Sequence, residues 1–246
     1  MSLFTGKTVL IADSHLSGEE EEKRLFFRML EKIRKDAPER LVFLGDIFEL
    51  WIALPGYETP LQKEFLSFCK EAKKEFPISF VEGNHEFYVK YNCKKAFTCV
   101  HDRILPMGED ALLIHGDTVN KADWKYASLR ILIRNCVTSF LLRLLSLTWG
   151  VETAHRIRLI LKPTNKTWKT RFPEEAFAAS LEKLPEKKRG KTIFTGHFHS
   201  YNHLTVNGTE IHTIPAWDME KALIGLWDGR EKKLEILSLQ ERGELN

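Results

Sequence analysis

Five short apolar segments of this 246-residue chain each end in a polar cluster that carries a side chain able to bind a metal. Short continuous apolar runs are typical of strands buried on both faces, as in a parallel sheet covered by helices. Amphipathic spacing between the first segments indicates intervening helices, so the pattern predicts an α/β fold. The five predicted strands are 8–12, 41–44, 78–81, 111–114 and 192–194.

Local signals refine this outline at both ends of the chain. Ser17 and Glu20 have the spacing of a capping box, and Thr59-Pro60 is a typical N-cap and first-turn pair, so each is predicted to start a helix. Near the C-terminus, Asn207-Gly208 and Asp228-Gly229 are two-residue hairpin signals. They predict that an antiparallel meander closes the chain.

The polar clusters after the strands contain seven potential metal ligands. The carboxyl ends of parallel strands lie along one edge of a sheet, so these residues are expected to meet in one pocket. The Asp-x-His and His-x-His spacings place two ligands on the same side of an extended chain. The candidate ligands are Asp13, His15, Asp46, Asn84, His115, His197 and His199.

The donor types indicate which ions this pocket would bind. Imidazole, carboxylate and amide donors without thiolate favour Mn²⁺, Fe²⁺ or Zn²⁺ in a catalytic role. Seven ligands exceed the needs of one ion, whereas two ions ~3.5–4 Å apart that share a carboxylate fit, and such pairs serve phosphoester hydrolysis. His85, beside Asn84, is placed to stabilise an oxyanion or to protonate a leaving oxygen.

The five blocks resemble those of the calcineurin-like metallophosphoesterases. They read Asp13-Ser14-His15, Gly45-Asp46, Gly83-Asn84-His85-Glu86, His115 and Gly196-His197-Phe198-His199. The resemblance covers the chain outside an insertion and implies a single domain, 1–246, with a two-sheet mixed sandwich flanked by helices.

The same resemblance implies a role for each residue. One metal would take Asp13, His15, Asp46 and His199. The other would take Asp46, Asn84, His115 and His197, with Asp46 bridging. His85 would be the general acid or oxyanion binder. Glu86 stands where Asp is commoner and is expected to orient His85 by a hydrogen bond.

The segment 118–171 interrupts the alternation of predicted strands and helices, and we interpret it as a helical insertion, or lid. It holds eleven Lys or Arg residues and two acidic ones, a local charge of +9, whereas the remainder of the chain carries −6. A solvated helical face usually mixes signs, so this bias indicates a polyanionic partner: nucleic acid, an anionic membrane surface or a phosphorylated ligand.

The start of the insertion reads His115-Gly116-Asp117-Thr118, followed by Asp123, Tyr126, Arg130 and Arg134. This pattern resembles the start of the insertion in the UDP-2,3-diacylglucosamine pyrophosphatases of lipid A biosynthesis. The resemblance implies hydrolysis of the substrate's diphosphate to UMP and 2,3-diacylglucosamine 1-phosphate (lipid X), by a cytoplasmic enzyme resting on the inner membrane. Members of that family often carry Arg where this chain has His85. The expected substrate-binding residues are Asp123, Tyr126, Arg130 and Arg134, on one helical face, with Glu49 and Trp51 from the stretch after Asp46.

The sequence leaves other functions open. A phosphatase or phosphodiesterase with a soluble nucleotide or other phosphoester substrate would use the same metal centre, and a nuclease is a variant of that alternative. A non-catalytic scaffold is the second alternative, but all seven ligands and His85 are present. The start of the chain lacks a signal-peptide layout and the four cysteines lack disulfide-scaffold spacing, so a reducing, cytosolic location is expected. Metal identity, acyl length and oligomeric state stay open.

Overall fold

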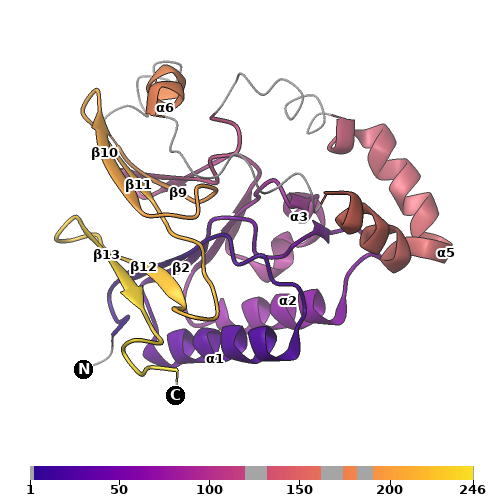
Figure 1. Cartoon of the computed structure of the whole chain (residues 1–246), viewed down its shortest axis with the longest axis horizontal. Coiled ribbons are helices and arrows are strands. Elements are labelled where there is room, and N and C mark those ends of the chain that lie inside the picture. Colours follow the sequence, from indigo (N-terminus) through magenta and orange to yellow (C-terminus); the bar gives the residue numbers. More distant parts are fainter. Residues whose placement is uncertain (1–2, 120–131, 162–173, 182–190, 246) are drawn as a thin grey trace.

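Two mixed β-sheets stacked face to face form the core of the molecule (Figure 1). A computed structural model of the chain describes residues 3–119, 132–161, 174–181 and 191–245. The predicted α/β sandwich flanked by helices is confirmed.

The first sheet has six strands in the order β13-β12-β1-β2-β4-β6. Strands β1, β2 and β4 and the edge strand β6 are parallel to one another. Strand β12 runs antiparallel to β1, and β13 runs antiparallel to β12. Their bounds are β1 Thr8–Ile11, β2 Arg40–Phe43, β4 Ile78–Val81, β6 Cys99–His101, β12 Leu223–Asp228 and β13 Lys233–Ser238.

The second sheet has five strands in the order β10-β11-β9-β8-β7, in which β8, β9 and β11 are parallel and the two edge strands are antiparallel. Its strands are β7 Ile104–Met107, β8 Ala111–Ile114, β9 Thr192–Thr195, β10 Asn202–Val206 and β11 Thr209–Thr213. A small parallel pair, β3 (Trp51–Ile52) and β5 (Glu86–Phe87), lies outside both sheets.

Side-chain alternation along the strands builds two apolar layers. In β1 and the residue after it, Val9 and Ile11 join the core under the helices, whereas Leu10 and Ala12 join the core shared with the second sheet. Helices α1 (Glu20–Asp36) and α2 (Pro60–Ala72) cover the outer face of the first sheet (Figure 1). The short α3 (Val89–Asn92) and the 3₁₀ turn Lys94–Ala96 follow β5.

The two predicted helix starts have different outcomes. Thr59 is the N-cap of α2, as predicted, and it forms a capping box in which Gln62 is the reciprocal partner. The Ser17–Glu20 box is wrong, because α1 begins at Glu20 after an N-cap, Glu19, whose side chain makes no capping bond. Glu22 instead turns its carboxylate back to the N–H and hydroxyl of Ser17.

The C-terminal hairpins form, but not as one meander. Asn207-Gly208 joins β10 to β11 in the second sheet, and Asp228-Gly229 lies in the connection of β12 to β13 in the first. The second turn is longer than two residues because β13 begins at Lys233. Each hairpin joins a different sheet, since β12 pairs with β1 and β11 with β9.

The described part of the insertion is mainly helix α5 (Cys136–Leu161), followed in the chain by α6 (Glu174–Leu181). One side of the insertion, including Leu142, Ala154 and Ile157, packs on residues of β3 and β5 and their neighbours. The other side leaves Val137 and Phe140 mostly exposed. Among the described helices, none is long and apolar enough to cross a membrane. Phe177 of α6 packs on the outer face of the second sheet.

Candidate metal centre

Loops from both sheets bring the seven candidate ligands together. Asp13 and His15 follow β1, Asp46 follows β2, and Asn84 follows β4, all in the first sheet. The second sheet supplies His115 after β8 and both His197 and His199 after β9. The side chains gather where the carboxyl ends of these strands meet, as strand topology predicts.

Asp46 lies at the centre of the cluster. Its Oδ2 atom is 3.5 Å from His115 Nε2 and 3.8 Å from His15 Nε2. Its Oδ1 atom accepts a hydrogen bond of 2.9 Å from the backbone N–H of His85. One carboxylate therefore faces histidines of both predicted ligand sets, which is the arrangement that a bridging ligand requires.

The two halves of the cluster extend from Asp46 in different directions. In one half, His199 Nε2 lies 3.4 Å from Asp13 Oδ1 and 3.2 Å from His15 Nε2. In the other half, Asn84 Oδ1 lies 3.1 Å from both His115 Nε2 and His197 Nδ1. The donors thus lie in two groups on either side of Asp46, and their assignment to two ions stays a prediction.

The donor set fits divalent ions. Adjacent donors bound to one ion at ~2.0–2.2 Å lie about 2.8–3.6 Å apart in octahedral or tetrahedral geometry, which matches most of these separations. Asp13 Oδ1 and Asp46 Oδ2 are buried and have no hydrogen-bond partner among the described residues. Unpaired buried carboxylate oxygens are costly, and a cation at this position would remove that cost.

Five of the seven residues have a left-handed backbone. The φ angles are 52° at Asp13, 44° at His15, 54° at Asp46, 71° at His197 and 57° at His199. This conformation is rare outside glycine and costs of order 1–3 kcal/mol per residue. Backbone bonds from Asp13 N–H to the Gly45 carbonyl and from His15 N–H to the Asp46 carbonyl hold the loops in this shape.

Gly83 is required by the close approach of two ligand loops. A Cβ at this position would lie 2.2 Å from Asp46 Oδ1 and 2.7 Å from the Asp46 backbone nitrogen. Any side chain here would push the bridging carboxylate away from its position. The glycine therefore allows the loop after β4 to pass directly beside the loop after β2.

Charges within the cluster shift its pKa values in opposite directions. Burial alone lowers the pKa of His115, but the charges of Asp46 and Asp13 outweigh it and raise that pKa to about 10. Burial and the neighbouring His115 lower the pKa of His197 to about 4. The facing histidines hold the pKa of Asp46 well below its usual range in spite of burial, so this carboxylate is ionised.

His85 points its second ring nitrogen at the cluster. Its Nδ1 donates a hydrogen bond of 2.6 Å to the Glu49 carbonyl, since a carbonyl can only accept. This fixes the tautomer and places Nε2 3.8 Å from Asp46 Oδ2. His85 is thus held by Glu49 through its main chain, and a protonated Nε2 can donate into the centre.

Glu86 does not orient His85, so that prediction is wrong. Its buried carboxylate accepts hydrogen bonds of 2.7–2.8 Å from the backbone N–H groups of Asp46, Ile47 and Gly83. Burial and the charge of Asp46 raise its pKa, whereas the three backbone N–H donors favour the ionised carboxylate and oppose that rise. Glu86 therefore fastens the loop that carries Asp46 to the loop that carries Asn84.

Arg134 has partners other than those predicted for it. Its Nη2 donates 2.8 Å bonds to the carbonyls of Gly83 and Glu86, and its Nη1 lies 3.1 Å from a Glu82 carboxylate oxygen. All of these contacts are to the loop between β4 and β5, and the predicted contact of Arg134 with the substrate stays a prediction. Arg134 connects the insertion to the segment that carries Asn84 and His85.

Of the other predicted substrate contacts, Glu49 is half-buried beside His85 and stays a prediction, whereas the rest lie in the core or outside the described part of the chain. Trp51 is fully buried among aromatic side chains, which leaves its ring no surface for a ligand to touch. Asp123, Tyr126 and Arg130 lie outside the described residues.

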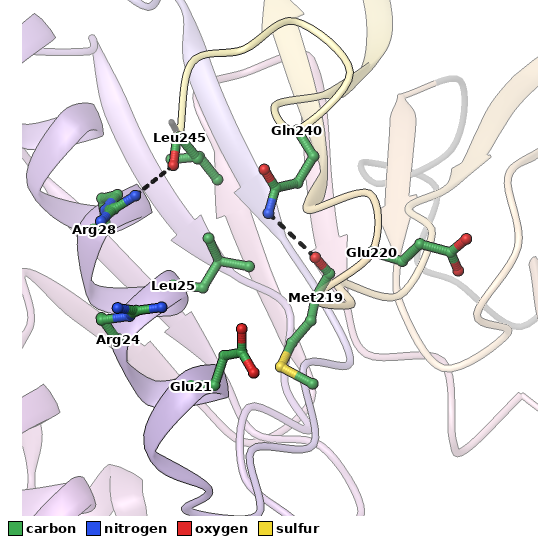
Figure 2. Close-up of a pocket in the computed structure, with 8 residues that line it drawn as sticks. All are labelled: Glu21, Arg24, Leu25, Arg28, Met219, Glu220, Gln240 and Leu245. Carbon is green, nitrogen blue, oxygen red and sulfur yellow. Dashed lines mark hydrogen bonds between the residues drawn. The ribbon is translucent and has the colours of Figure 1, made fainter.

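A separate hollow of about 430 Å³ lies between α1 and the C-terminal residues (Figure 2). Two hydrogen bonds join residues that line it: Arg28 donates to the Leu245 carbonyl, and Gln240 donates to the Met219 carbonyl. None of the seven candidate ligands lines this hollow. Its polar groups serve to join α1 to the chain's C-terminal end.

The model of the calcineurin-like phosphoesterase family matches residues 6–201. The chain belongs to this family and is a metal-dependent phosphoester hydrolase. Similar proteins include a UDP-2,3-diacylglucosamine hydrolase of Pseudomonas fluorescens, 28% identical over 93% of this chain and 90% of its own length. Another of that name, from Azotobacter vinelandii, is 30% identical over 87% of this chain and 91% of its own length. A solved archaeal phosphodiesterase aligns with 94% of this chain and 98% of its own at 12% identity and a TM-score of 0.46.

Proposed function

We propose that this enzyme hydrolyses the diphosphate of UDP-2,3-diacylglucosamine to UMP and 2,3-diacylglucosamine 1-phosphate. The observation that carries the proposal is the similarity, along nearly the whole chain, to hydrolases named for that substrate. The gathered donor set supports the hydrolytic part of the proposal, because the seven side chains lie at separations suited to divalent ions.

The centre would hold two divalent ions, for which Mn²⁺ is our first choice and Fe²⁺ or Zn²⁺ the alternatives. Asp13, His15 and His199 would bind one ion, Asn84, His115 and His197 the other, and Asp46 both. When bound, the ions supply a Lewis acid that activates water at neutral pH and neutralises charge on phosphate oxygens.

The remaining work falls to the chain's own residues. His85, fixed through Nδ1 by the Glu49 carbonyl, would donate from Nε2 to the phosphate oxygen on which negative charge develops. Glu86 keeps Asp46 and Asn84 in register by binding backbone N–H groups of both loops. These contacts orient the substrate phosphate before reaction, and preorganisation of this kind is a large part of catalysis.

The insertion is our candidate for the lipid part of the substrate. Its described helix carries large apolar side chains that are about half exposed or more: Val137, Phe140, Leu141, Leu144, Leu145 and Val151. Apolar side chains beside basic ones suit acyl chains and an anionic membrane surface. We propose that the enzyme works in the cytoplasm at the inner leaflet, and that Asp123, Tyr126 and Arg130 contact the nucleotide or diphosphate.

A substrate comparison tests this function. The Mn²⁺-loaded protein is assayed for UMP release from UDP-2,3-diacylglucosamine in detergent micelles, with bis-p-nitrophenyl phosphate and a UDP-sugar without acyl chains as references. We expect the acylated substrate to have a kcat/KM at least 100-fold above both references. Similar values for all three would refute the lipid assignment while keeping the phosphoesterase.

A matched variant separates the insertion's contribution from the chemistry. Phe140→Asp, on the exposed side of α5, should lower kcat/KM for the acylated substrate and leave the rate with bis-p-nitrophenyl phosphate unchanged. Cleavage of single-stranded DNA or RNA that falls steeply with salt would instead identify a nuclease.

A further inference from the structure

The β10–β11 hairpin carries a second cluster of potential metal ligands, apart from the centre described above. His203 of β10 lies directly opposite His212 of β11, and Glu210 is two residues before His212, so all three share one face of the hairpin. Their ligand atoms lie within 4.8 Å of one another. In Figure 1 this hairpin is at the edge of the second sheet.

His212 is the buried member of this cluster. Its side chain is 8% exposed, and neither ring nitrogen has a hydrogen-bond partner among the described residues. The ring stacks on Phe194 with centroids 5.7 Å apart, which fixes its plane. A buried imidazole without a polar partner needs an explanation, and a bound ion or water at its nitrogen is the usual one.

The distance between His212 and Glu210 favours an ion. His212 Nε2 is 3.7 Å from Glu210 Oε2, too far for a hydrogen bond. The corresponding imidazole–carboxylate distances in the dimetal centre are 3.4 Å for His199–Asp13, 3.5 Å for His115–Asp46 and 3.8 Å for His15–Asp46. The separation of the hairpin pair therefore lies within the range of the imidazole–carboxylate pairs in the candidate metal centre.

We propose that His203, Glu210 and His212 form an additional site for a divalent transition-metal ion, with Zn²⁺ as the ion that best suits two imidazoles and a carboxylate. Water fills the remaining position, because the described chain supplies three donors. His203 and Glu210 are exposed, so the site exchanges its ion more readily than the buried centre and binds it more weakly.

Binding changes the packing of His203. Its ring now lies parallel to that of His212, with centroids 4.3 Å apart and an interplanar angle of 2°. The nitrogen lone pairs of parallel rings do not converge on one point, so the exposed His203 ring turns toward the ion and the stack opens. The ion then cross-links the edge strand β10 to β11.

This cross-link lies close in sequence to the dimetal centre. β10 begins three residues after His199, and Thr213 Oγ1 in β11 accepts a 2.6 Å bond from the Asn202 N–H at that start. An ion at the hairpin therefore stabilises the segment that leaves the His197–His199 loop. The site is independent of which phosphoester the enzyme cleaves.

Metal counting tests the proposal. Chelator-stripped protein is equilibrated by dialysis against micromolar Zn²⁺, and bound zinc per chain is measured for the wild type, His203→Asn and His212→Phe. His101→Asn is the control, since His101 belongs to neither cluster. We expect three zinc ions per chain in the wild type and the control, and two in both hairpin variants.

Two further readouts make the outcome unambiguous. The third ion should raise the unfolding midpoint of the wild type by a few degrees and leave that of His203→Asn unchanged. Zinc should also shift the imidazole NMR signals of His203. Two zinc ions in the wild type, or three in His203→Asn, would overturn the proposal. If His212→Phe disturbs the sheet, the zinc count of His203→Asn is used instead, because His203 is exposed.

Discussion

Replacing Arg134 with methionine should loosen the loop that carries Asn84 and His85. The guanidinium of Arg134 binds the carbonyls on both sides of these residues, at Gly83 and Glu86, and faces the Glu82 carboxylate. Methionine keeps much of the side chain's apolar length and removes all three polar contacts. None of the seven metal-binding donors is replaced, so any loss of metal affinity comes from their changed positioning.

The expected cost follows from burial. Glu82 is 2% exposed and Arg134 15%, and removing one partner of a buried pair costs about 3–5 kcal/mol. Glu82 retains the Lys90 N–H at 2.7 Å, which places the loss at the lower end, about 3 kcal/mol. The two sheets do not depend on this contact. The loss of unfolding free energy is therefore limited to the cost of separating the insertion from the loop.

Urea unfolding, metal content and steady-state kinetics of Arg134→Met measure the effect, with Arg143→Met as the control. Arg143 contacts Asn92 at the exposed surface, so its loss should stay below about 1 kcal/mol. A double-mutant cycle with Glu82→Gln should give a coupling of at least about 1 kcal/mol. Equal stability and equal kcat/KM for Arg134→Met and Arg143→Met would refute the reasoning.

Three further perturbations test the centre itself. Glu86→Gln should destabilise the fold by about 2–4 kcal/mol and lower metal content, because an amide NH₂ would face backbone N–H donors. Denaturation and elemental analysis measure the two effects. Wild-type metal content in Glu86→Gln would contradict the role of Glu86 in holding the two ligand loops together. His85→Asn should lower kcat by about 10²–10⁴ at unchanged metal content, and a drop in metal content instead would make His85 a ligand. Metal binding should strengthen up to tenfold per pH unit between pH 7 and 10, because His115, with a pKa raised to about 10, must lose its proton first. Calorimetry in buffers of different ionisation heat counts the released proton. Metal binding that does not change with pH would exclude competition between the proton and the metal ion at His115.

The sequence predicts the ligand cluster well because strand order and residue period determine it. Asp46, Asn84 and His115 come after short apolar runs, and parallel strands bring the residues at their carboxyl ends to one edge. No knowledge of side-chain packing is needed for this step. The N-cap at Thr59 is predictable for a different reason, because a helix cap depends only on residues within one helical turn.

Features that depend on distant parts of the chain are the ones that sequence patterns miss. Helical spacing groups Arg134 with Asp123, but its partners are set by where the insertion meets the loop after β4, about fifty residues away. Trp51 lies close to Asp46 in sequence, yet the chain turns it into the aromatic core. The pairing of β12 with β1 separates two hairpins that look alike in sequence.

The left-handed ligand residues show why this centre depends on braces away from the donors. Left-handed φ angles at Asp13, Asp46 and His197 cost energy, and hydrogen bonds from the His85 and His197 N–H groups to the carboxylates of Asp46 and Asp13 recover only part of it. Glu86 contacts the backbone of the Asp46 loop, and both Glu86 and Arg134 contact the backbone of the loop that carries Asn84. Metal affinity should therefore respond to these two residues, neither of which is among the seven donors, almost as strongly as to the donors.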